Sequence, residues 1–224
     1  MLKVLKKDFF FSYFFISIIS LMSLFAIFNE LQFKSSEAST NGVAIENLIY
    51  LKLKNGVVVI QLFPEVAPKT VSRIKELTRA GFYNNNLFFR VIEGFVAQVG
   101  DPTGTGRGGS GKTLNAEFSN VSHKRGIVSM ARANDVNSAD SQFFIVLKDS
   151  EFLDTKYTVF GKVISGMEFV DDIKKSKTGS SGIVTDPDKI YSMALAIDVD
   201  KSMKEEIKKS KKAEIGSIKD RENN

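Results

Sequence analysis

The sequence predicts a mainly β protein: a closed antiparallel eight-stranded β-barrel with two plugging helices, preceded by one N-terminal transmembrane helix. Short apolar runs separated by Gly- and Asn-rich turns recur along residues 45–198. Only two segments there have helical periodicity, too few for the alternating strands and helices of a parallel sheet. A long uncharged stretch lies before them. Two stacked sheets would show the same strand count, so a sandwich stays open at this point.

The N-terminal segment has the composition of a membrane-spanning helix. Lysines within residues 1–8 precede an uncharged stretch from Phe9 to Phe28, which as a helix would span roughly 30 Å, the thickness of a bilayer core. The positive-inside rule puts residues 1–8 in the cytoplasm and the rest of the chain across the membrane. The rival interpretation is a cleaved signal with Ser36-Glu37-Ala38 as its site. That site lies well beyond the end of the apolar stretch, which favours an uncleaved anchor over residues 9–28.

A polar linker, residues 29–44, leads into the domain at 45–198, and a Lys- and Glu-rich tail, residues 199–224, follows it. Asn55-Gly56 between two apolar runs predicts a hairpin. One helix is expected from Thr70 as its N-cap to Gly81 as its stop, and a second over residues 166–174. The runs expected as strands are 49–54, 57–62, 87–92, 95–99, 126–130, 143–147, 158–163 and 189–197.

The composition excludes several classes of chemistry. There is no cysteine, so disulfides, thiol catalysis and cysteine-bound metals are ruled out. The net charge of +5 comes from a basic terminus and a mixed-sign tail. No run interleaves basic residues with stacking aromatics, so no nucleic-acid partner is expected. Nothing indicates a metal, an organic cofactor or an oligomer, and a monomer is expected.

Residues Gly106–Thr113 match the pattern of a phosphate-binding P-loop, G-x-x-x-x-G-K-T. Such a loop needs a buried strand before it and a helix after it, so that the helix N-terminus faces the phosphates. Residues 114–120 lack a helical period, and no strand ending in a magnesium-binding Asp follows. A glycine-rich surface loop without a nucleotide is the better interpretation, and a nucleotide enzyme stays as a second hypothesis.

Four stretches resist a purely structural explanation. They are FFRVIEGFVAQVGD at 88–101, SMARA at 129–133, NSADSQFFI at 137–145 and FLDTKYTVFGKV at 152–163. In order and spacing this set resembles the cyclophilin-type peptidyl-prolyl cis-trans isomerases, and its Met-Ala-Arg and Tyr157 are similar to the bacterial branch of that family.

The resemblance spans about residues 49–197 and implies a function. It implies the barrel fold, rotation about X–Pro peptide bonds as the reaction, proline-containing polypeptides as partners, and no cofactor. In a bacterium, the anchor would hold the domain on the periplasmic side of the inner membrane, and cleavage would release it into the periplasm. A proline-binding module or holdase with little turnover is the alternative function.

The resemblance also implies roles for single residues. Arg90 would donate a hydrogen bond to the proline nitrogen, while Gln98 and Gln142 would hold the arginine and the substrate carbonyl. Rotation breaks no covalent bond, so a fixed donor suits it better than a nucleophile or an acid–base pair. Taken alone, Arg90 would be an ordinary exposed strand arginine. The other substrate-binding residues that the resemblance implies are Phe95, Val96, Ala131, Arg132, Ala133, Phe144, Phe152, Leu153 and Tyr157.

The spacing of these residues poses one difficulty. Gln142 and Phe144 are two apart and share a strand face. Phe95 and Gln98 are three apart, so a regular strand would point them to opposite faces, and a bulge or bend must intervene. For Phe95, Phe144 and Leu153, core packing is the rival interpretation. His123, the only histidine, is expected to serve a turn.

The two interpretations of the N-terminus predict different mature proteins. An uncleaved anchor leaves residues 9–28 on the protein extracted from membranes, and mass spectrometry of its N-terminal peptide checks this. A mature chain beginning at Ser39 would instead establish a cleaved signal.

Overall fold

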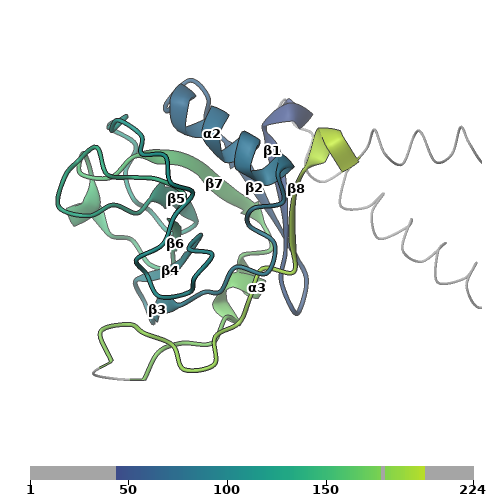
Figure 1. The fold of residues 1–224 in the computed structure, drawn as a ribbon, viewed down its shortest axis with the longest axis vertical. Helices are drawn as coiled ribbons and strands as arrows, with labels where there is room; N and C mark the ends of the chain where they lie inside the picture. The colour runs from purple at the N-terminus through teal and green to yellow at the C-terminus, as the bar shows by residue number, and fades with distance from the viewer. Residues whose placement is uncertain (1–43, 178–179, 200–224) are drawn as a thin grey trace, which may run out of the picture. The chain divides into compact units, whose positions relative to one another are not determined.

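The computed structural model describes residues 44–177 and 180–199 (Figure 1). The predicted transmembrane helix at 9–28, nearly all of the linker and nearly all of the charged tail lie outside these described residues. Within the described ranges, no helix has the length and apolar character needed to cross a membrane.

Eight antiparallel strands form one curled sheet, as the sequence predicts. The strand order across the sheet is β3-β4-β6-β5-β7-β2-β1-β8. The strands are β1 (Leu48–Lys52), β2 (Val57–Leu62), β3 (Arg90–Ile92), β4 (Val96–Val99), β5 (Ile127–Met130), β6 (Phe143–Val146), β7 (Val159–Ser165) and β8 (Ser192–Leu195). The β1–β2 hairpin turns through residues 53–56, with Lys52 opposite Val57, which confirms the predicted turn.

The prediction of a closed barrel is wrong in one respect. β3 and β8 are the two ends of the sheet and do not pair with each other in the described ladders. Residues 180–191 pass beside β3 and pair with it through one isolated bridge, between Arg90 and Ile183. This segment contains Gly182 and Pro187, together with left-handed backbone at Ser181 and Asp186. Such residues disfavour a continuous strand, so the sheet stays open.

Two of the helices in the described residues pack into the main core, and residues 196–199 are also helical. The first, α2 (Pro68–Arg79), begins earlier than predicted, and its N-cap is Ala67 rather than Thr70. The carboxylate of Glu117, from a distant loop, accepts hydrogen bonds from the amides of Lys69 and Thr70 at 3.0 and 2.8 Å. A long-range carboxylate therefore caps this helix, which no local pattern shows.

The predicted stop of α2 is confirmed. Ala80 is its C-cap, and Gly81 follows with a φ of +68°, the left-handed conformation that ends many helices. The second helix, α3 (Met167–Asp171), is shorter than the predicted segment 166–174. In Figure 1, α2 lies at the top of the curled sheet and α3 lies toward the bottom. Each helix buries apolar side chains in the main core.

The two faces of strands β3, β4 and β6 serve different purposes. Val91, Ala97 and Ile145 belong to the main core inside the curl. Val96, Phe144 and Val146 belong to a second apolar cluster on the opposite face. Because side chains alternate along a strand, Arg90 and Gln98 lie on that second face.

Replacement of Phe160, a residue of the main core, tests the assignment of that core. Its ring is 1% exposed and packs edge-on to the Phe143 ring, with centroids 5.9 Å apart. We expect Phe160→Ala to lower the free energy of unfolding by about 3–5 kcal/mol, because it leaves a cavity. Phe118→Ala, at a ring that is 41% exposed, is the control and should change it by about 0.5 kcal/mol or less. Guanidinium unfolding measures both, and equal losses would contradict the core assignment.

Candidate active site

A line of side chains crosses three strands on the second face of the sheet. Arg90 on β3 is directly opposite Gln98 on β4, and Gln98 is directly opposite Phe144 on β6. Directly opposed residues of antiparallel strands have side chains about 5 Å apart. The register therefore places a cation, an amide and an aromatic ring in one row.

A chain of polar contacts fixes Arg90. Its Nη1 donates to Gln98 Oε1 at 3.1 Å, and Gln98 Nε2 donates to Gln142 Oε1 at 2.9 Å. Gln142 Nε2 in turn donates to the backbone carbonyls of Gly106 and Gly108 at 3.1 and 2.8 Å. The three residues that sequence reasoning singled out as polar are thus connected to one another, and the chain ends on a loop.

A pocket of about 290 Å³ with both polar and apolar side chains in its lining lies next to Arg90. Its lining consists of Arg90, Phe95, Val96, Gln98, Ala131, Arg132, Phe144, Leu153 and Tyr157. All nine are residues that the family resemblance implies for catalysis or substrate binding. The structure brings them together from five separate parts of the chain, and their roles stay predictions.

Phe95 reaches this pocket because it is not part of β4. It occupies the turn between β3 and β4, after Gly94 with a φ of +64°. Its amide donates to Ile92 O at 3.0 Å, and its carbonyl accepts from the Leu147 amide at 2.8 Å. The tight turn is the bend that the spacing of Phe95 and Gln98 requires.

A larger groove of about 500 Å³ adjoins the pocket and shares Gln98, Ala131 and Arg132 with it. Ala133 and Gln142, both implied for substrate binding, line this groove and not the pocket. The Arg132 guanidinium lies over the Tyr157 ring, 5.0 Å from its centroid. Arg132 Nε also donates to the Lys156 carbonyl at 3.0 Å. The side chain thus ties the segment at 131–133 to the far wall of the pocket.

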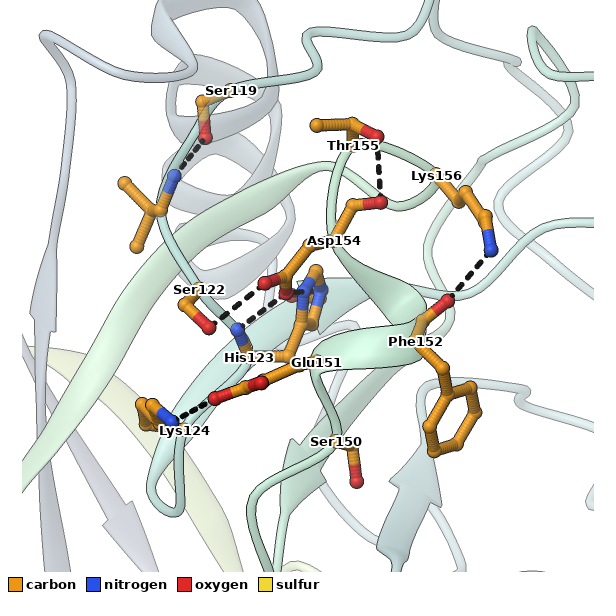
Figure 2. A network of polar contacts seen from close by, with 12 residues as sticks. Ser119, Ser122, His123, Lys124, Ser150, Glu151, Phe152, Asp154, Thr155 and Lys156 are labelled. Carbon is orange, nitrogen blue, oxygen red and sulfur yellow. Dashed lines mark hydrogen bonds and ion pairs between the residues drawn. The ribbon is translucent and has the colours of Figure 1, made fainter.

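Phe152 is the implied residue that lines neither hollow. It lies in the short 3-10 helix η2 (Glu151–Leu153), and 63% of its surface is exposed. Its ring centroid is 5.4 Å from that of Phe95. Figure 2 shows the ring pointing away from the polar network behind it. Phe152 therefore stands beside the pocket, with a ring open to solvent.

His123 lies buried behind the pocket, at 0% exposure. Its ring stacks on Phe144 with centroids 6.3 Å apart. Asp154 Oδ1 accepts from the His123 amide at 2.7 Å and lies 2.8 Å from the ring Nδ1 (Figure 2). The Ser129 hydroxyl lies 3.0 Å from Nε2. His123 thus joins the Leu153–Asp154 segment to the wall of the pocket, a wider role than the predicted turn.

Burial and hydrogen bonding shift the acid–base behaviour of two groups here. Partial burial lowers the pKa of Arg90, and the neighbouring Tyr157 opposes that effect. Burial raises the pKa of Asp154, but the hydrogen bonds from His123 and Ser122 outweigh it and hold that pKa below its ordinary value. Arg90 remains a cation at any working pH, because a guanidinium titrates far above neutrality.

The stretch with P-loop letters is an irregular loop. The preceding strand, β4, pairs only antiparallel to its neighbours, and no helix follows between Thr113 and β5. The confirmed interpretation is a glycine-rich loop. Its contact with Gln142 is a feature that sequence reasoning missed. Within residues 44–177 and 180–199, no three His, Asp or Glu side chains gather in a way that suits a metal ion.

Comparisons with known proteins agree with this geometry. The family model described as cyclophilin type peptidyl-prolyl cis-trans isomerase/CLD matches residues 48–195. A probable peptidyl-prolyl cis-trans isomerase of Brucella suis is 47% identical over 165 residues, covering 68% of this chain and 84% of the relative. Peptidyl-prolyl cis-trans isomerase-like 3 of Rattus norvegicus is 48% identical over 125 residues, covering 54% and 77%.

Solved structures agree as well. A cyclophilin from Hirschia baltica has a TM-score of 0.61 at 29% identity, covering 68% of this chain and 75% of that one. A Cryptosporidium parvum cyclophilin type isomerase, crystallised in the presence of the dipeptide Ala-Pro, has a TM-score of 0.61 at 31% identity, covering 66% and 98%. The family model over residues 48–195, the relatives and the solved structures show that the chain belongs to the cyclophilin-type peptidyl-prolyl cis-trans isomerases.

Proposed function

We propose that this protein catalyses rotation about X–Pro bonds by holding the proline ring in the apolar pocket while Arg90 donates a hydrogen bond to the proline nitrogen. The observation that carries this is the position of a guanidinium at the edge of a pocket lined by Phe95, Phe144 and Leu153. Gln98 accepts a hydrogen bond from the guanidinium, and Gln142 holds Gln98 in turn.

The size of the barrier explains why such a donor is enough. Rotation about a peptide bond costs about 18–20 kcal/mol, because conjugation is lost in the twisted state. The nitrogen then becomes pyramidal and gains a lone pair, which the planar forms do not offer. A donor held at that point stabilises the twisted amide more than either planar isomer, which is the condition for catalysis.

The rest of the site suits an extended peptide. A pocket of about 290 Å³ has room for a proline and part of the residue beside it, and a related cyclophilin was crystallised in the presence of the dipeptide Ala-Pro. Ala131–Ala133 follow β5 without joining a named strand, and they would meet the peptide through main-chain groups. Recognition centred on the proline implies loose selectivity among clients.

The proposal extends to location. The uncharged stretch at 9–28 behind basic residues supports an anchor in the inner membrane, with the catalytic domain on the periplasmic side. Exported proteins folding there would be the clients. Cleavage after Ala38 would leave the same domain free in the periplasm.

Replacement of the donor tests the mechanism. We expect Arg90→Ala to lower kcat for an X–Pro peptide about 10²–10³-fold, because one well-placed donor is lost. Arg79→Ala is the matched control. Arg79 is an arginine on α2 that pairs with Asp198 at 2.8 Å, and its loss should leave the rate unchanged. Exchange of cis and trans peptide, followed by nuclear magnetic resonance with the purified protein, measures both.

The same assay separates the isomerase from a proline-binding holdase. If Arg90→Ala turned over peptide as fast as the wild type, the arginine mechanism would be wrong. If the wild type itself bound the peptide but did not accelerate exchange, the holdase would be the better assignment.

The pH dependence is a second test. Burial lowers the pKa of Arg90, but a guanidinium loses its proton only far above neutral pH. The charge therefore persists over the whole working range. We expect kcat to stay nearly constant from mildly acidic to mildly alkaline pH in peptide exchange measurements. A sharp loss with an imidazole-like titration would contradict the mechanism and point to His123.

A further inference from the structure

The glycine-rich loop, residues 100–113, is built around a carboxylate of its own. Asp101 is 0% exposed. Its Oδ1 accepts from the Thr103 amide and hydroxyl, both at 2.7 Å. Its Oδ2 accepts from the amides of Thr105, Gly106 and Gly108 at 3.1, 2.6 and 3.1 Å. Successive amides that converge on one anion form a nest of the kind that binds phosphate in nucleotide enzymes, but here the anion is internal.

The glycines of the P-loop pattern make room for this carboxylate. A Cβ at Gly108 would lie 2.2 Å from Asp101 Oδ1, well inside contact distance. Gly106 has a φ of +82°, a conformation that other residues rarely adopt. These two positions therefore need glycine for the carboxylate to be enclosed, which accounts for part of the P-loop resemblance without a nucleotide.

The same two glycines hold the polar chain that reaches Arg90. Their amides face Asp101, and their carbonyls accept the Nε2 of Gln142 at 3.1 and 2.8 Å. A carbonyl only accepts and a guanidinium only donates. With a pure acceptor at one end and a pure donor at the other, each glutamine amide has only one orientation that satisfies both of its neighbours. The loop thereby sets the direction of every hydrogen bond up to Arg90.

We propose that Asp101 is a positioning residue for the isomerase reaction, acting through the Gly106 and Gly108 carbonyls, Gln142 and Gln98 on the Arg90 guanidinium. Asp101 does not line the pocket or the groove. The inference rests on the proposed role of Arg90.

The charge of Asp101 is maintained over the working range. Burial raises its pKa, but hydrogen bonds from Thr103 and from the amides of Gly108 and Gly106 outweigh burial and hold the pKa below its ordinary value. A depressed carboxyl pKa gives stability that is present above the unfolded value, about 3.9, and is lost as the pH falls through the folded value. The nest therefore loses its anion only in acid.

Asp101→Asn is the direct test. Each carboxylate oxygen accepts at least two hydrogen bonds, so an amide in either orientation turns an NH₂ group toward other donors. We expect kcat for an X–Pro peptide to fall by up to about 10²-fold, the cost of a small misplacement of a catalytic group. The Kd of the peptide should change less than kcat, because the pocket proposed to hold the proline ring is untouched. Peptide exchange and titration of the full-length protein measure the two quantities.

A control variant and a double variant separate an effect on the position of Arg90 from a general loss of protein structure. Asp149→Asn also removes a carboxylate that accepts a backbone amide, that of Arg125 at 2.8 Å, but far along the chain from this loop, and it should leave kcat unchanged. In an Arg90→Ala background, Asp101→Asn should change kcat by less than about 2-fold. The effects of two substitutions in one hydrogen-bond network are not additive.

Two results would overturn the inference. One is a wild-type kcat in Asp101→Asn, and the other is a loss in the Arg90→Ala background as large as in the wild type. If Asp101→Asn does not fold, Thr103→Val removes the hydroxyl bond to Oδ1 together with the contacts of that hydroxyl with Thr105 in the same loop. It should then lower kcat severalfold in the wild type and not in Arg90→Ala, and a wild-type rate would refute the inference. A normal kcat in Arg90→Ala alone would instead refute the proposed function.

Discussion

The site depends on one constraint: a flexible arginine must be held still at the rim of an apolar pocket. An arginine side chain loses about 2 kcal/mol of rotamer entropy when it is fixed. Here the cross-strand register of Arg90, Gln98 and Phe144 brings the cation beside an amide and the amide beside a ring. Gln142 continues the row, and the glycine-rich loop closes it. The strands supply the positions, and the loop supplies the rigidity.

Much of this arrangement was predictable from local patterns. Alternation and turn residues indicate each of the eight strands, and the end of α2 at Gly81 follows from its left-handed glycine. The family resemblance selects every residue that lines the pocket. Local patterns do not indicate contacts between distant parts of the chain. Glu117 caps α2 from a loop far along the sequence, and the edge of the sheet at β3 is paired through a long-range bridge between Arg90 and Ile183.

The roles of buried polar groups were the least predictable features, because such a role depends on whether solvent or substrate can reach the group. Ser129, His123 and Asp154 have the hydrogen-bond spacings of a hydrolytic triad. Ser129 is 0% exposed, so no peptide bond can reach its hydroxyl. Asp101 presents the opposite case: its loop has the letters of a phosphate site, while its amides already hold a carboxylate. In both places the residue types suggest a reactive or ligand-binding site. Their burial indicates instead that they stabilise the structure around the pocket.

The isolated bridge between Arg90 and Ile183 also covers the open edge of β3. The strand that carries Arg90 is the outermost of the sheet, and a bare outer strand is a template on which an unfolded chain can add itself and aggregate. The Val91 amide donates to Gly182 O at 2.8 Å, and the Val184 amide donates to Phe89 O at 3.0 Å. These main-chain groups are thus already satisfied within the molecule. An unfolded chain would therefore find these main-chain groups of the edge strand already paired.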